Sequence, residues 1–146
     1  MTFNDSKNMK KQVIVVVVGA IRFGNKYLLT KRVHKDKLWH DRWQLPGGQL
    51  EHSEEISHCL KRELKEEVNI PIKDSMFIPM VYENIRYGSN NSHIILVPFL
   101  CKVKTNNFKI KLDKEASAFN WYTMPQIKKL KTLNGTAEIV ENAEKL

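Results

Sequence analysis

One stretch of the chain has a clear helical pattern of apolar positions. Ile56, Leu60, Leu64 and Val68 recur every four residues. This spacing predicts a helix from about Glu54 to Val68 with a single apolar face.

Most of the other apolar segments predict strands. Val13–Ala20 is an almost unbroken run of valines, which predicts a strand buried on both faces, as in a sheet covered by helices. A Gly/Asn turn at 22–26 connects it to a second predicted strand, Tyr27–Arg32. Later segments are predicted as strands at Met76–Tyr87, His93–Val103 and Ala118–Thr123, and as helices at Met124–Lys131 and Thr136–Lys145. Strands mixed with two or three helices predict an α/β sandwich.

The length of 146 residues fits one domain. We expect a polar tail over 1–11 and a single domain over 12–146. Lys10-Lys11 before the valine run imitates a secretion signal, but no cleavage site of small residues follows. No apolar run reaches the ~20 residues that a membrane span needs. We expect Cys59 and Cys101 to be buried thiols, and we predict a cytoplasmic protein.

The formal charge of +8 has a local explanation. Lysines 102, 104, 109 and 111 alternate with apolar residues around the turn sequence 105–107, which predicts a hairpin with one solvated lysine face. Basic residues are not interleaved with exposed aromatic residues, so we expect no binding to nucleic acid. The positive charge would attract small polyanions.

Against this positive background, the predicted helix concentrates acidic residues. Glu63, Glu66 and Glu67 are three and four residues apart, so their carboxylates share one helix face. Like charges at these spacings destabilise a helix by about 0.2–0.5 kcal/mol per pair. A divalent cation would convert the repulsion into ligation, whereas the alternative is a solvated acidic face.

The acidic helix and the glycines before it form a spaced pattern. It reads Gly48, five residues, Glu54, seven residues, Arg62-Glu63-Leu64, one residue, Glu66-Glu67, two residues, Ile70. This pattern resembles the Nudix box of the MutT-like hydrolases, whose fold is a mixed β-sheet between helices.

Two positions depart from the family pattern. Asn69 stands where the box ends in glycine, and asparagine is the second choice for the left-handed residue after a helix. Ser53 stands where the family often has glycine, and we predict that it caps the helix, with Glu54 and Glu55 in the first turn.

The resemblance implies roles for residues of the box. Mg²⁺, with Mn²⁺ as a possible substitute, would be held by Glu63, Glu66 and Glu67, with Gly47 as a further candidate ligand. Glu66 or another glutamate would accept a proton from the attacking water, and Arg62 would pair with Glu54 to brace the helix. Gly47 and Gly48 would let the main chain approach the substrate and the carboxylates.

Roles outside the box are also implied. Glu115, with Asp113 as a substitute, would add a carboxylate to the metal site, and Arg32 would contact phosphate. Asn134 stands where some MutT-like enzymes read the base. Further candidates for the substrate pocket are Tyr82, Arg86, His93 and Trp121.

The expected reaction is hydrolysis of a nucleoside triphosphate to a nucleoside monophosphate and pyrophosphate. The alternatives are substrates with a linked diphosphate, such as ADP-ribose, a dinucleoside polyphosphate or capped RNA. A catalytically idle domain that binds nucleotides or a protein remains a different class of function. We expect a monomer or homodimer and no membrane partner.

Overall fold

A computed structural model describes residues 11–82, 86–87 and 92–146. The predicted tail, apart from Lys11, and residues 83–85 of the predicted strand Met76–Tyr87 lie outside the described residues.

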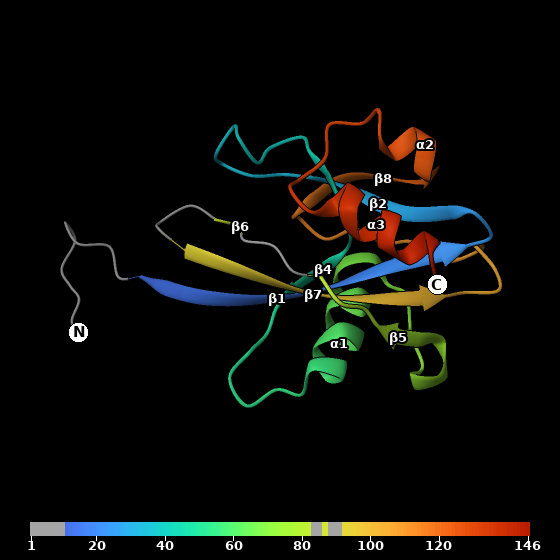
Figure 1. Ribbon diagram of the computed structural model, residues 1–146, viewed down its shortest axis with the longest axis horizontal. Coiled ribbons are helices and arrows are strands. Elements are labelled where there is room, and N and C mark those ends of the chain that lie inside the picture. Colours follow the sequence, from blue (N-terminus) through green and yellow to red (C-terminus); the bar gives the residue numbers. More distant parts are fainter. Residues whose placement is uncertain (1–10, 83–85, 88–91) are drawn as a thin grey trace.

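In the described part of the chain, a mixed sheet of eight strands forms the centre of the fold (Figure 1). Its longest strands, β1 (Gln12–Phe23) and β7 (Ser92–Lys102), run parallel in register from Gln12 opposite Ser92 to Arg22 opposite Lys102. The remaining strands are β2 (Lys26–Arg32), β3 (Trp43–Gln44), β4 (Gly47–Gln49), β5 (Phe77–Pro79), β6 (Arg86–Tyr87) and β8 (Ala116–Thr123).

The first two strands separate soon after their hairpin. They pair only at Arg22 with Tyr27 and at Phe23 with Lys26. Beyond that point the segment 43–49 pairs first with β2, through β3, and then with β1, through β4. Segment 43–49, which contains Gly47 and Gly48, is therefore held between the diverging strands β1 and β2.

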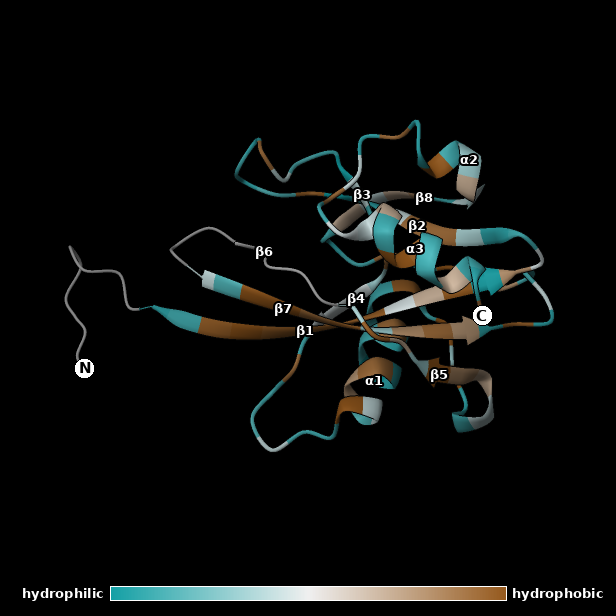
Figure 2. Cartoon of the chain, in the orientation of Figure 1, coloured by the Kyte–Doolittle hydropathy of each residue, from teal (hydrophilic) through white to brown (hydrophobic). Residues whose placement is uncertain are grey.

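Helices cover both faces of the sheet (Figure 1). Helix α1 (Ile56–Val68) packs on one face, and α2 (Met124–Ile127) and α3 (Thr136–Glu144) pack on the other. Strand β1 contributes Val17 and Ile21 to the core under α1, and Val18 and Ala20 to the core under α3. The prediction that the valine run is buried on both faces is confirmed from Val17 onward, and Figure 2 shows the apolar strands between the helices.

The C-terminal end of α1 agrees with the prediction, but its start differs. Asn69 is left-handed (φ 61°), and its N–H donates to the carbonyl of Lys65. The predicted cap at Ser53 is wrong: Ser53 has φ 63° and lies in a turn closed by the Glu54 N–H and the Glu51 carbonyl. The helix begins at Ile56 with Glu55 as N-cap, so Glu54 precedes it. A positive φ explains why glycine suits the Ser53 position.

The predicted lysine hairpin is also wrong. After β7 ends at Lys102, residues 103–115 form no strand. This segment instead lies alongside the C-terminal end of α1. There the Lys111 N–H donates to the carbonyl of Val68, and Asn69 Nδ2 donates to the carbonyl of Lys109. Its apolar residues Phe108, Ile110 and Leu112 pack on the core under α1. Burial of these side chains outweighs pairing across a turn.

Two other predicted elements are shorter than expected. Within Met76–Tyr87 the structure describes only β5 and β6 as strands. Helix α2 ends at Ile127 and continues to Leu130 as turns.

Candidate functional site

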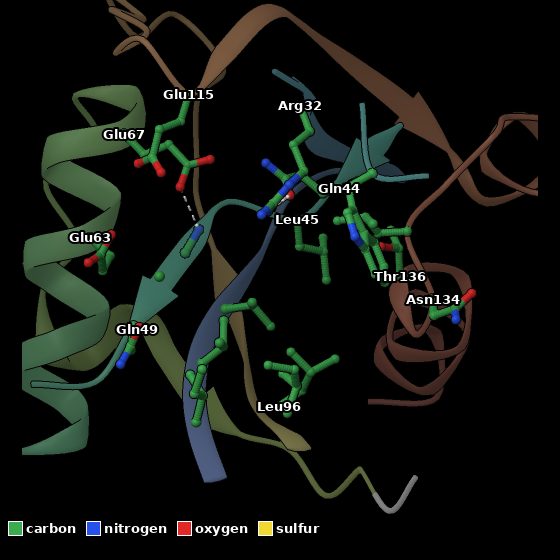
Figure 3. Close-up of a pocket in the computed structure, with 18 of the residues that line it drawn as sticks. Arg32, Gln44, Leu45, Gln49, Glu63, Glu67, Leu96, Glu115, Asn134 and Thr136 are labelled. Carbon is green, nitrogen blue, oxygen red and sulfur yellow. Dashed lines mark hydrogen bonds between the residues drawn. The ribbon is translucent and has the colours of Figure 1, made fainter. Parts of the chain in front are cut away.

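A cleft of about 490 Å³ opens beside β4 (Figure 3). Glu63, Glu67 and Glu115 lie at one end, and Asn134 and Thr136 lie at the other. Between them lie apolar side chains from β1, β7 and Leu45, with polar residues around them: Ile14, Val16, Val18, Leu45, Ile94 and Leu96 are the apolar ones. The cleft therefore joins an acidic end to a surface suited to a flat apolar group.

Glu67 is the most deeply buried acid of the site, at 4% exposure. Its Oε2 accepts from the Gly47 N–H at 3.0 Å and its Oε1 accepts from the Thr30 hydroxyl at 3.3 Å. Burial raises the pKa of Glu67 to about 8; the Gly47 N–H opposes this rise, and the nearby charges of Asp113, Glu115 and Glu63 add to it.

The two glycines of β4 leave room for the backbone and for Glu63. A Cβ at Gly47 would stand 2.1 Å from the Val17 carbonyl oxygen. A Cβ at Gly48 would stand 2.1 Å from Glu63 Oε2, so this carboxylate lies directly against the glycine backbone. The close approach expected for this glycine pair is confirmed.

Arg62 connects three glutamates. It donates to both Glu54 oxygens, from Nε at 2.6 Å and from Nη2 at 2.9 Å, and its Nη1 donates to Glu63 at 2.8 Å and to Glu66 at 3.2 Å. The predicted Arg62–Glu54 pair is confirmed. Hydrogen bonds from Arg62 hold the pKa of Glu54 well below its usual range, whereas burial raises the pKa of Glu63.

Glu66 differs from its neighbours in exposure. Its side chain is 55% exposed, and it does not belong to the lining of the cleft. Of the three glutamates predicted to share one helix face, Glu63 and Glu66 meet at Arg62, whereas Glu67 is buried against Gly47 and Thr30, so their contacts and their solvent access differ.

The donor set at the acidic end fits a hard divalent cation. It consists of carboxylate oxygens, and the charges of Glu66 and Glu115 add to the rise in the pKa of Glu63. A cation would relieve this repulsion. Among the residues that the structure describes, no three acidic, histidine or cysteine side chains already converge as a cation site.

Of the two loop acids, only Glu115 reaches the cleft. Asp113 instead accepts a hydrogen bond from the Glu115 N–H through Oδ1, at 2.9 Å. The Glu115 carbonyl in turn accepts from the Val33 N–H. These contacts hold the loop beside the end of β2.

Arg32 lines the cleft from the end of β2, as expected for a residue that contacts substrate. Its Nη1 donates to Gln44 Oε1 at 3.1 Å. Its Nε and the indole nitrogen of Trp39 are buried and have no hydrogen-bond partner within the described residues. A guanidinium in a cleft wall suits an anionic ligand.

The structure separates the other pocket candidates. Asn134 lines the far end of the cleft, whereas Tyr82 lies beside it with its hydroxyl against Gly135, and His93 is not part of the lining. Arg86 lies in β6, and its side chain lies outside the described part of the chain.

The placement of Trp121 in the pocket is wrong. Its ring packs edge-on against Phe23 in the core under α1, with centroids 6.5 Å apart. Strand alternation is the reason, because Trp121 pairs with Leu28, which faces α1.

Sequence reasoning missed several lining residues, among them His34, Trp39 and Gln44. A tryptophan within the polar loop between two strands was the available signal for Trp39. Gln44 had no such signal.

The two cysteines lie in the core and not in the lining of the cleft. Cys59 and Cys101 are free and buried, as predicted, and burial raises the pKa of each thiol to about 12. In the described ranges, no helix is both long and apolar enough to cross a membrane.

Comparison with known proteins places this site in a family. The family model of the NUDIX domain matches residues 10–143. An 8-oxo-dGTP diphosphatase of Buchnera aphidicola subsp. Schizaphis graminum is 28% identical over 137 residues, covering 90% of this chain and 93% of that protein.

Solved structures share the fold. The MutT protein from Methanosarcina mazei Go1 has a TM-score of 0.71 at 22% identity, covering 94% of this chain and 97% of that one. A bifunctional NMN adenylyltransferase/ADP ribose pyrophosphatase from Francisella tularensis, solved with AMP and a Mn ion, has a TM-score of 0.73 at 22% identity, covering 95% of this chain and 43% of that one. Because the NUDIX match extends over nearly the whole described domain, the chain belongs to the Nudix family and is a Nudix hydrolase.

Proposed function

We propose that this enzyme hydrolyses a nucleoside triphosphate to a nucleoside monophosphate and pyrophosphate, with Mg²⁺ as cofactor and Mn²⁺ as a substitute. The observation that carries the proposal is the cleft itself. It joins a cluster of carboxylates at one end to apolar side chains and Asn134 at the other, with the guanidinium of Arg32 between them (Figure 3).

The cation would be held by Glu63, Glu66 and Glu67, with Gly47 and Glu115 as further ligands. When bound, Mg²⁺ neutralises charge on the phosphates and lowers the pKa of a bound water. Glu67 supplies a carboxylate that already accepts a hydrogen bond from the Gly47 N–H. Glu63 supplies one that Gly48 brings against the backbone of β4.

The remaining residues orient these ligands and the substrate. Arg62, fixed by its two hydrogen bonds to Glu54, holds Glu63 and Glu66 at one guanidinium. Glu66, which is the most exposed of the three, accepts the proton of the attacking water, with Glu115 as the alternative base. The guanidinium of Arg32, which lines the cleft, binds phosphate oxygens, and Asn134 contacts the base.

The triphosphate is favoured by the relative from Buchnera, which carries the name 8-oxo-dGTP diphosphatase and has nearly the same length as this chain. An oxidised purine triphosphate is therefore the first substrate to test. ADP-ribose is the second, because the Francisella protein of the same fold is an ADP ribose pyrophosphatase.

A substrate panel with identified products tests the proposal. It contains canonical and oxidised triphosphates, ADP-ribose, a dinucleoside polyphosphate and capped RNA, each assayed with Mg²⁺ and with EDTA. Release of pyrophosphate and a monophosphate from one triphosphate, with loss in EDTA, supports it. If a linked diphosphate is cleaved in preference to every triphosphate, the proposed substrate class is wrong and linked diphosphates take its place. Binding of nucleotide without any product would indicate an idle domain.

A further inference from the structure

Two polar residues between the guanidinium of Arg32 and the carboxylate of Glu67 have no role in the proposed reaction. Thr30 is a fully buried polar residue in the middle of β2, and Gln44 stands opposite it in β3 as its cross-strand partner. Residues two apart on a strand face the same side, so Thr30, Arg32 and Gln44 share one surface of the sheet.

Hydrogen bonds connect these residues in one line. Arg32 Nη1 donates to Gln44 Oε1 at 3.1 Å, and Gln44 Nε2 donates to Thr30 Oγ1 at 3.5 Å. The Thr30 hydroxyl then donates to Glu67 Oε1 at 3.3 Å. This chain of hydrogen bonds starts at the Arg32 guanidinium in the wall of the cleft. It ends at the buried Glu67 carboxylate, at the acidic end of the cleft.

The direction of donation follows from the chemistry of the groups. A guanidinium can only donate, so Arg32 must use the oxygen of the Gln44 amide. The amide nitrogen therefore faces Thr30, and the threonine oxygen accepts from it. The hydroxyl hydrogen remains for Glu67, whose Oε1 accepts it. Each group fixes the orientation of the next.

We propose that Thr30 and Gln44 are positioning residues, which orient the Glu67 carboxylate for a divalent cation and tie it to the phosphate-binding Arg32. This inference rests on the proposed function, in which Glu67 is a metal ligand. Outer residues that hydrogen-bond a metal ligand typically change metal affinity or activity by about 10–100-fold when removed.

Thr30→Val keeps the shape of the side chain and removes the hydroxyl. We expect its Mn²⁺ affinity, measured by titration calorimetry or by the electron paramagnetic resonance of free Mn²⁺, to fall about tenfold. Thr30→Ser restores the hydroxyl and should return the affinity to within about threefold of the wild type. Thr105→Val makes the same chemical change in an exposed loop and should leave the affinity unaltered.

Gln44→Leu tests the other link. It should also weaken Mn²⁺ binding and should raise KM for the nucleotide, because Arg32 loses its anchor. As both residues belong to one line of hydrogen bonds, the double variant should lose little more Mn²⁺ affinity than the worse single variant. Circular dichroism and a melt in EDTA check that each variant is folded.

The outcomes separate this inference from the proposed function. If the folded Thr30→Val protein binds Mn²⁺ as tightly as the wild type, or if the two single effects simply add, Thr30 and Gln44 are structural and the inference fails. If the wild type does not bind Mn²⁺, or if Glu67→Gln binds it unchanged, the proposed metal site fails instead.

Discussion

Arg62, in the middle of α1, forms a bidentate pair of hydrogen bonds with Glu54, in the turn that precedes the helix. The guanidinium contacts both carboxylate oxygens of Glu54, at 2.6 and 2.9 Å, and still has Nη1 free for Glu63 and Glu66. A planar guanidinium can make these contacts together because its donors point in fixed directions. The pair thus connects the entry of the helix to two of the proposed metal ligands.

Arg62→Lys keeps the charge but cannot reproduce this geometry. We expect kcat to fall about 10–100-fold, because Glu63 and Glu66 lose their shared donor. Steady-state kinetics at saturating Mg²⁺ measure the change. Arg22→Lys is the matched control, since Arg22 donates to the carbonyl of Ala143 and does not line the cleft. An Arg62→Lys enzyme as fast as the control would show that the Arg62–Glu54 pair does not orient Glu63 and Glu66.

Glu66→Gln tests the proposed base. Because this side chain is 55% exposed, the substitution should leave the melting temperature nearly unaltered. We expect kcat to fall about 10²–10⁴-fold, the range for loss of a general base. Pyrophosphate release and a thermal melt measure the two effects, with the exposed Glu55→Gln as control. Full activity of the Glu66→Gln enzyme would make Glu115 the proposed general base instead.

The two glycines of β4 should respond differently to alanine. At Gly47 the new Cβ would meet the backbone of Val17, so Gly47→Ala should cost more than about 3 kcal/mol of folding free energy. At Gly48 it would meet the end of the Glu63 side chain, which can move. We therefore expect Gly48→Ala to fold and to lose most of its activity.

Thermal melts and kcat measured on both glycine variants distinguish these expectations. Gly24→Ala serves as control because its Cβ would have open space, and only its positive φ of 60° costs about 1 kcal/mol. An active Gly48→Ala enzyme would mean that the displaced Glu63 is not needed.

The buried Glu67 predicts a pH dependence of stability without metal. Burial raises its pKa in the folded state from the ordinary 4.5 to about 8. Between these values the unfolded chain has lost the proton and the folded chain keeps it, so stability falls as the pH rises through this window. Below pH 4.5 both states are protonated and the contribution is constant.

Thermal melts in EDTA from about pH 5 to about pH 8.5 measure this slope, which should amount to several degrees. Glu67→Gln should reduce it. Saturating Mg²⁺ should stabilise the protein most at the alkaline end, because ligation needs the ionised carboxylate. A melting temperature that rises with pH in EDTA would contradict the raised pKa.

The sequence by itself determined the helix, its acidic face and the family. Apolar residues every four positions are enough to predict α1, and the spacing of Gly48, Glu54, Arg62 and the glutamates is a local property of the chain. The left-handed conformation of Asn69 also follows locally, because few residues other than glycine and asparagine adopt it easily.

Only the tertiary structure decided how far each acid is exposed and which distant residues meet it. Glu66 and Glu67 are adjacent in the chain, yet one is largely exposed and the other is buried against Gly47 and Thr30. Likewise Trp121 faces the core under α1, and the lysine segment follows α1. Register, strand divergence and burial set these outcomes, and they depend on contacts between residues far apart in the sequence.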